Sequence, residues 1–264
     1  MSGQLAGKVA IVTGAGSIAP GIGNGKATAV LFAREGAHVV LVDLRSDAAL
    51  ATREMILQEG RDCFAMQADV SCIEDCNRVV GECIRQFGRL DILHNNVGIE
   101  IAGGLESATP EIWAKTLQVN LTSMFFMCKQ AIVPMKAQKH GVITNISSIN
   151  ATRTAPTISL PYSVSKAGVL ALTREIAVEY AACGVRANSI LPGMMSTPFV
   201  TAYLTQAYGG DVEEMMRIRD RHCPTGRQGT GWDVANLAVF LASDAAAYIT
   251  GAEFIVDGGQ SCRF

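Results

Sequence analysis

The stretch KVAIVTGAG, residues 8–16, decides the fold of this chain. Residues 8–13 are a short apolar run rich in β-branched side chains, which predicts a buried strand, and Gly14-Ala15-Gly16 predicts a tight turn after it. Residues 26–35 have apolar side chains at helical spacing, and residues 37–42 (AHVVLV) again predict a strand. A strand, a helix and a strand in this order predict a βαβ unit with parallel strands.

The same alternation continues to the end of the chain. Further strands are predicted at residues 62–67, 90–94, 141–147, 185–191 and 253–256, and further helices at 46–59, 73–87, 110–138, 162–183 and 233–241. Residues 196–231 mix aromatic and methionine side chains with charges, and we expect mobile helices there that form a substrate lid at about residues 194–231. The pattern predicts a single-domain Rossmann fold over residues 1–264, a doubly wound parallel sheet of about seven strands with helices on both faces.

Composition excludes several classes of protein. Charged residues are 17% of the chain, the formal net charge is -2 and hydrophobic residues are 49%, which argues against a nucleic-acid partner and against a disordered chain. The eight cysteines form no CxxC pair, so we expect reduced thiols in a cytoplasmic protein and no metal site. The start of the chain lacks the apolar core of a signal peptide, and no apolar run is long enough for a membrane span. These observations favour a cytoplasmic protein that acts on a small molecule.

Small or polar residues stand where the predicted strands end. These residues are Gly14, Asp43, Asp69, Asn95, Ser148 and Pro192. Ligands of parallel sheets bind outside the carboxyl ends of the strands, so we expect a polar cleft at this edge. Five glycines between the first strand and the first helix would let the backbone approach a pyrophosphate. Asp43 would accept hydrogen bonds from ribose hydroxyls and repel a 2′-phosphate, which favours NAD over NADP, although Arg45 could turn toward a phosphate.

Tyr162 and Lys166 are four residues apart, on one face of the helix that contains them. A lysine charge beside a tyrosine favours the phenolate and lowers the phenolic pKa toward neutrality. Such a pair can perform acid–base chemistry.

These motifs occur in the order seen in classical short-chain dehydrogenases/reductases, and the chain resembles that family over nearly its whole length. The resemblance rests on several separate motifs: Thr13-Gly14, Asp69-Val70, Asn95-Asn96-Val97-Gly98, Asn120, the serine near the fifth strand, Tyr162 with Lys166, Pro192-Gly193 to Thr197, and Asp257-Gly258-Gly259. It implies an NAD-dependent oxidoreductase that interconverts a secondary alcohol and a ketone, assembled as a homotetramer or homodimer. Its alternatives are an NADPH-dependent ketoreductase of the same family and a non-catalytic dinucleotide-binding regulatory protein.

The resemblance also implies a catalytic set. Tyr162 would be the acid/base, Lys166 would lower its pKa and bind the nicotinamide ribose, Asn120 would hold a water of the proton relay, and Ser148 would orient the substrate oxygen. The family places its serine at the position of Ile149, so Ser148 requires one extra residue in the loop before Tyr162. Ser147 is the competing candidate.

The residues implied for cofactor binding lie at the same strand ends. They are Gly14, Ser17, Gly23, Asn24, Gly25, Asp43, Leu44, Asp69, Val70, Asn96, Val97, Gly98, Tyr162, Lys166, Pro192, Gly193 and Thr197. The first turn is longer than the usual family loop and allows two alignments. Gly21-Ile22-Gly23 has the familiar sequence, but Gly23-Asn24-Gly25 has the expected distance to the helix, and we prefer it. The inserted residues would then form one rim of the site.

Substrate contacts are predicted from position alone. The candidates are Glu100, Asn150, Arg153, Met194, Met195 and Phe199, with Tyr203 and Tyr208 on the lid. Arg153, together with Arg217, Arg219 or Arg221, could pair with an acidic group of the substrate.

Overall fold

The structure is a computed structural model that describes residues 3–154 and 159–263. Seven parallel strands form one sheet in the order β3-β2-β1-β4-β5-β6-β7. The strands are β1 (Val9–Thr13), β2 (His38–Asp43), β3 (Cys63–Gln67), β4 (Ile92–Asn95), β5 (Gly141–Ile146), β6 (Val185–Pro192) and β7 (Glu253–Val256). The chain starts in the centre of the sheet, builds one half outward to β3, and returns to build the other half from β4 to β7. The predicted Rossmann architecture is confirmed.

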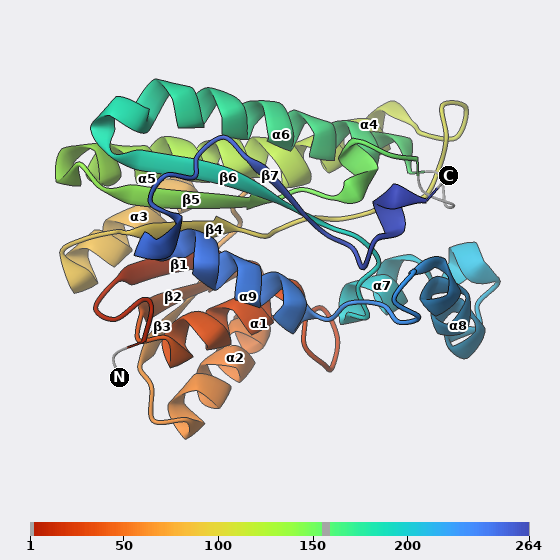
Figure 1. The fold of residues 1–264 in the computed structure, drawn as a ribbon, viewed down its shortest axis with the longest axis horizontal. Coiled ribbons are helices and arrows are strands. Elements are labelled where there is room, and N and C mark those ends of the chain that lie inside the picture. The colour runs from red at the N-terminus through yellow and green to blue at the C-terminus, as the bar shows by residue number, and fades with distance from the viewer. Residues whose placement is uncertain (1–2, 155–158, 264) are drawn as a thin grey trace.

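Helices cover both faces of the sheet (Figure 1). The helices α1 (Asn24–Arg34), α2 (Ser46–Gln58) and α9 (Gly231–Ala242) lie on one face, and α3 (Ile73–Phe87), α5 (Ser123–Gln138) and α6 (Leu160–Tyr180) lie on the other. Side chains of β1 alternate between the two cores, because Ala10 and Val12 pack with α1 and α9, whereas Val9 and Ile11 pack with α3 and α5. A strand buried on both faces explains the continuous apolar run in the sequence.

The segment predicted as one helix at residues 110–138 is divided in the structure. It consists of α4 (Pro110–Leu117), a π-helical turn over residues 118–122, and α5. The π turn contains Asn120, whose side chain accepts from the Ile99 amide at 2.8 Å and donates to the Ile99 carbonyl at 2.9 Å. Helical periodicity continues through such a turn, so the sequence pattern does not show it.

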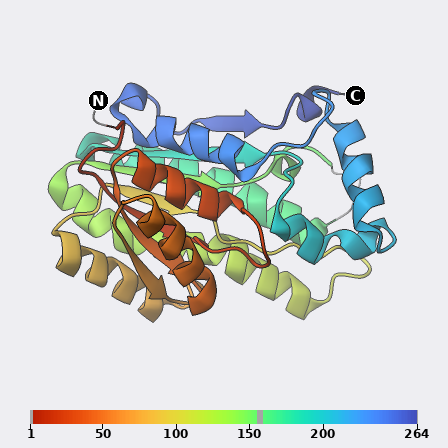
Figure 2. The same ribbon diagram turned by 90° about the horizontal axis from the view of Figure 1, so that it is seen from below.

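The less regular region after β6 forms α7 (Pro198–Tyr203), a short 3₁₀ turn over residues 205–208, and α8 (Val212–His222). These elements project beyond the carboxyl end of the sheet (Figures 1 and 2). The helix expected to begin at Asp233 begins at Gly231, because Thr230 is its cap and the Thr230 backbone amide donates to the Asp233 carboxylate at 2.7 Å.

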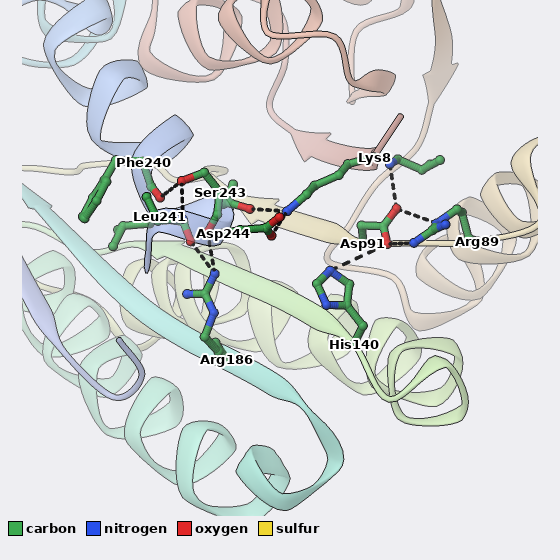
Figure 3. A network of polar contacts seen from close by, with 12 residues as sticks. Lys8, Arg89, Asp91, His140, Arg186, Phe240, Leu241, Ser243 and Asp244 are labelled. Carbon is green, nitrogen blue, oxygen red and sulfur yellow. Dashed lines mark hydrogen bonds and ion pairs between the residues drawn. The ribbon is translucent and has the colours of Figure 1, made fainter. Parts of the chain in front are cut away.

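A polar network ties the opposite, amino-terminal edge of the sheet (Figure 3). The fully buried Asp91 carboxylate accepts from the Val9 amide at 2.9 Å and from the Arg89 guanidinium at 2.6 Å. Nearby, Lys8 forms an ion pair with Asp244 at 2.6 Å. These contacts stabilise the amino-terminal edge of the sheet, so a binding site is expected at the carboxyl edge.

No helix in residues 3–154 and 159–263 is long and apolar enough to cross a membrane. Likewise, no group of three or more His, Cys, Asp or Glu side chains in residues 3–154 and 159–263 could hold a metal ion.

Candidate active site

One cavity of about 360 Å³ lies at the carboxyl edge of the sheet, between the strand ends and the elements after β6. Most of the predicted site residues line it. They are Gly14, Ser17, Gly23, Asn24, Gly25, Asp43, Leu44, Asn96, Val97, Gly98, Glu100, Ser148, Asn150, Tyr162, Lys166, Pro192, Gly193, Met194, Met195, Thr197, Phe199, Tyr203 and Tyr208. Residues from the loops after β1, β2, β4, β5 and β6 thus meet the α6 side chains in one cleft, as the carboxyl ends of parallel strands require.

Besides Arg217 and Arg221, which are exposed on α8, four predicted residues do not line this cavity. Asn120 is fully buried beneath it, and Val70 packs in the core on the α3 side of the sheet. Asp69 lies beyond β3, where its carboxylate accepts from the Ser71 amide and hydroxyl at 2.9 and 2.6 Å. Arg153 is exposed and donates to the carbonyls of Thr152 and Ser261. Their proposed contacts with dinucleotide or substrate stay predictions.

The glycine-rich turn brings α1 close to the end of β1. A Cβ on Gly25 would lie 2.1 Å from the Gly14 carbonyl oxygen, and Gly14 itself has a φ of +62°. Gly23 caps α1, which begins at Asn24, as the second of the two alignments expects. The Oδ1 atom of Asn24 is buried and has no hydrogen-bond partner within the part of the chain described. A bare backbone and a free helix N-terminus facing a cavity fit the pyrophosphate of a dinucleotide.

The inserted residues of this turn reach toward α7. The Ser17 hydroxyl accepts from the Gly23 amide and donates to the Gly21 carbonyl, both at 3.1 Å. Gly21 has a φ of +124° and sits against the Pro198 ring at the start of α7. A second hollow of about 340 Å³ lies between this turn, α7 and the start of α9. The insertion therefore forms a rim of the cleft, in contact with the element opposite.

Asp43 ends β2 and faces the same turn. Its carboxylate accepts from the Gly16 amide at 2.9 Å and from the Arg45 amide at 3.0 Å. The Arg45 side chain points elsewhere, because its guanidinium donates to the Asp47 carboxylate at 2.6 Å and to the Ile18 carbonyl at 2.8 Å. An acid held by two backbone amides therefore stands at the position expected for a ribose.

Tyr162 and Lys166 occupy the first turns of α6, beside the end of β5. The Lys166 ammonium lies 5.7 Å from the centre of the Tyr162 ring and donates to the Ile146 carbonyl at 2.9 Å. Burial lowers the pKa of Lys166 to about 8, and the nearby Glu100 charge opposes this shift.

The expected lowering of the Tyr162 pKa is not seen in this structure. Burial and then the Glu100 charge raise the pKa of the phenol, and its interaction with the Ser148 hydroxyl opposes them. The physical reason is that burial in the cavity wall removes solvent from the phenolate, and the Glu100 carboxylate adds a negative charge nearby, so both favour the neutral phenol.

Ser147 and Ser148 differ in their surroundings. The Ser147 hydroxyl donates to the Lys166 carbonyl at 2.8 Å, which uses its only proton. The Ser148 hydroxyl accepts from the Asn150 amide at 3.2 Å and interacts with Tyr162. The geometry therefore favours Ser148 as the residue that faces a substrate oxygen.

One cavity residue was only weakly indicated by the sequence. Arg219, on α8, is buried and lines the cavity, whereas Arg217 and Arg221 on the same helix are exposed. The signal was its spacing, because Arg219 stands four residues after the fully buried Met215 and so shares its helical face.

Comparisons with known proteins agree with this geometry. A family model described as "Enoyl-(Acyl carrier protein) reductase" matches residues 18–261. A solved structure of a short-chain dehydrogenase/reductase from Burkholderia xenovorans is 44% identical, covers 99% of both chains and has a TM-score of 0.96.

Two curated relatives are similar over nearly their whole length. A 2,5-dichloro-2,5-cyclohexadiene-1,4-diol dehydrogenase from Sphingobium indicum is 38% identical over 262 residues, which is 99% of either chain. A 3beta-hydroxysteroid dehydrogenase from Eggerthella lenta is 38% identical over 99% of this chain and 96% of its own. The names of both relatives describe dehydrogenases that act on hydroxyl groups.

Proposed function

This chain belongs to the classical short-chain dehydrogenase/reductase family, whose members use a nicotinamide dinucleotide to act on CH–OH groups, and we propose that it oxidises a secondary alcohol with NAD. One observation carries the proposal. Tyr162, Ser148 and Lys166 line the same cavity as the glycine-rich turn and Asp43. A proton acceptor and a dinucleotide cradle therefore open into one space.

The bound dinucleotide supplies the hydride acceptor when an alcohol is oxidised. Ser148 holds the substrate oxygen near the phenol, and the Tyr162 oxygen takes the hydroxyl proton as general base. Lys166, as an ammonium 5.7 Å from the centre of the ring, would supply the positive charge that stabilises the phenolate against the burial and the Glu100 charge that raise the pKa of Tyr162. In the reverse direction the phenol donates the same proton to the ketone oxygen.

Asn120 positions the backbone next to Tyr162 and Lys166. Its amide donates to Ser165 at 3.0 Å and bonds both backbone groups of Ile99, which positions the segment that follows β4. We keep the relay water at Asn120 as part of the proposal. The support for it is the π-helical turn, a distortion that is frequent at functional sites.

The choice of NAD over NADP is supported by charge. A 2′-phosphate at this position would meet the Asp43 carboxylate and would have to draw Arg45 away from Asp47 and Ile18. NADP use, as in the alternative ketoreductase, therefore requires two contacts to break.

The substrate end of the cavity is built by the lid that we propose at residues 194–231. Met194, Phe199, Tyr203 and Leu204 give it apolar walls. The names of both relatives described above give hydroxyl groups of ring compounds as their substrates. We therefore include alicyclic secondary alcohols among the substrates to be tested.

We also propose a homotetramer or homodimer in the cytoplasm. Apolar side chains are exposed on α4, α5 and α6, among them Trp113, Phe125, Val133 and Val178, and Ile255 is exposed on the edge strand β7. All eight cysteines are free, as in a reducing compartment. Light scattering after size exclusion measures the assembly directly.

The test of the reaction uses a panel of open-chain and alicyclic secondary alcohols with NAD and with NADP, followed by absorbance of the reduced dinucleotide. In Tyr162→Phe we expect turnover to fall at least about 100-fold while NAD binding, measured by calorimetry, is retained. Turnover that persists in this variant would remove Tyr162 from the proposal. Binding of NAD without turnover of any alcohol by the unmodified protein would favour the regulatory alternative.

A further inference from the structure

Arg219 places a guanidinium in the wall of the substrate end of the cavity. It is 5% exposed, although it lies on α8 between two exposed arginines. Arg217 and Arg221 form ion pairs with Glu214, on the outer side of the helix. Arg219 shares the inner face with Met215, so the fold directs this one charge inward.

The contacts of Arg219 leave part of its guanidinium available. Its Nε donates to the Gln228 side-chain oxygen at 2.7 Å, and Nη2 makes a long contact of 3.5 Å to the Met195 carbonyl. Among the residues described, Nη1 makes no hydrogen bond and no carboxylate forms an ion pair with Arg219. A buried charge without an anionic partner is costly, and such groups are rare unless a ligand provides the partner.

The guanidinium is also held in one orientation. The Gln228 side chain that accepts from Arg219 also donates through Nε2 to the Asp220 carboxylate at 3.1 Å. The Gln228 backbone amide donates to the same carboxylate at 2.9 Å. Support of this kind is typical of a binding residue, because it fixes the direction in which the remaining N–H groups point.

A partly buried arginine with a structural role has different contacts in this same protein. Arg186 donates to the carbonyls of Leu241 at 2.8 Å, Ser243 at 3.3 Å and Ile249 at 3.1 Å (Figure 3 shows the first two). Its donors are distributed among backbone acceptors of neighbouring loops, and it lies at the edge of the sheet away from the cavity. Arg219 has fewer acceptors and opens into the cavity instead.

The other charges in the cavity favour an anion. Glu100 and Lys166 are the further buried ionisable groups near Arg219, so two basic groups stand against one acid. Glu100 makes no ion pair with either within the described ranges, and burial raises the pKa of its carboxyl, opposed by the Ser159 hydroxyl and the charges of Arg219 and Lys166. A bound carboxylate would supply a second negative charge beside the two basic groups.

We propose that Arg219 binds the carboxylate of the substrate, so that the alcohol oxidised by this enzyme is a hydroxy acid. Its hydroxyl lies at Tyr162 and Ser148, its apolar body lies against Met194 and Phe199, and its carboxylate accepts the N–H groups of Arg219. The assignment of substrate class rests on the proposed alcohol oxidation at Tyr162, but the anion site itself does not.

The experiment compares two ligands of the same shape, cyclohexanecarboxylate and cyclohexanecarboxamide. Their binding is measured by calorimetry and by the shift in melting temperature, with and without NAD. The unmodified protein should bind the carboxylate at least about tenfold more tightly, because only it can pair with the buried guanidinium. Arg219→Met should weaken binding of the carboxylate about 30-fold or more and binding of the carboxamide less than about threefold.

Arg219→Lys serves as a second variant in case the methionine variant does not fold. It keeps the charge but not the fork of donors, and we expect it to retain part of the preference for the carboxylate. The matched controls are Arg217→Ala and Arg221→Ala on the same helix. Because these arginines are exposed, both variants should bind each ligand within about twofold of the unmodified protein.

Equal binding of the two ligands by the unmodified protein, or an equal loss of both in Arg219→Met, would overturn the proposal. Turnover separates it from the proposed function. The two substrates compared are 3-hydroxycyclohexanecarboxylate and cyclohexanol. If the enzyme oxidises both with equal catalytic efficiency, only the role of Arg219 is contradicted. Arg219-dependent binding of the carboxylate without oxidation of any alcohol contradicts only the oxidoreductase chemistry.

Discussion

Replacing Gly25 with alanine should damage this protein far more than the same change two residues earlier. A Cβ at position 25 would lie 2.1 Å from the Gly14 carbonyl oxygen and 2.4 Å from the Asn96 side-chain amide. The first neighbour is backbone at the end of a central strand, so it cannot turn aside. Because real contacts of this kind are never closer than 3.0 Å, α1 and the turn would have to separate by about 0.9 Å.

The size of the effect follows from this separation. Overpacking of a dense interior costs roughly 1–3 kcal/mol, and a clash with rigid backbone belongs at the upper end. For a chain of this length, a loss of about 3 kcal/mol lowers the melting temperature by roughly 6–12 °C. Dinucleotide affinity should also fall at least about tenfold, because the N-terminus of α1 moves away from the glycine-rich turn.

The matched control is Gly23→Ala. A Cβ there would meet nothing closer than the Ser17 hydroxyl at 3.5 Å, and the φ of −85° suits an L-residue. We expect a loss of less than about 1 kcal/mol, the usual difference between glycine and alanine at a helix cap. Calorimetric melting of both variants without added dinucleotide gives the comparison. Melting temperatures that agree within about 2 °C would refute the close packing of Gly25 on Gly14 and the alignment that depends on it.

Three further outcomes are expected. Asp47→Ala should release Arg45 and raise the ratio of NADP to NAD in catalytic efficiency about tenfold, measured by initial rates, and an unchanged ratio would contradict the view that Asp47 restrains Arg45. Burial lowers the pKa of Lys166 from 10.5 to about 8, so between these pH values the unfolded chain binds more protons than the folded protein. The free energy of unfolding, measured with denaturant, should therefore rise from pH 8 to 10.5 relative to Lys166→Met. The same pH dependence in both proteins would contradict this expectation. With a thiol reagent, Cys262 should react first in the native protein, since it alone among the cysteines is exposed, and Cys262→Ser should remove the fast phase.

Much of the fold could be predicted because its signals are local. The apolar runs of β1 and β2 and the turns that follow them depend only on neighbouring residues, and the right-handed βαβ connection then leaves few arrangements. The π turn at Asn120 could not be predicted in this way. It depends on a contact with Ile99, which lies 21 residues earlier, and the helical pattern is the same on both sides of it.

The candidate site shows the same division. Asp43 and Tyr162 were predicted from their places at a strand end and on a helix, and both line the cavity. Arg153 was predicted from its place in a loop, but it turns toward the Ser261 carbonyl, a contact between residues 108 positions apart. Loop side chains have no periodic constraint, so the rest of the fold decides their direction.

The sequence by itself determined the order of strands and helices, the bare glycine-rich turn after β1, and the spacing that puts Tyr162 and Lys166 on one helical face. Only the tertiary structure decided that the Ser147 hydroxyl donates to the Lys166 carbonyl, that burial raises rather than lowers the pKa of Tyr162, and that Arg219 alone of the α8 arginines lines the cavity. The physical reason is range. Periodicity and backbone freedom are properties of adjacent residues, whereas desolvation and hydrogen-bond partners are set by side chains that meet only when the sheet and the helices after β6 have packed together.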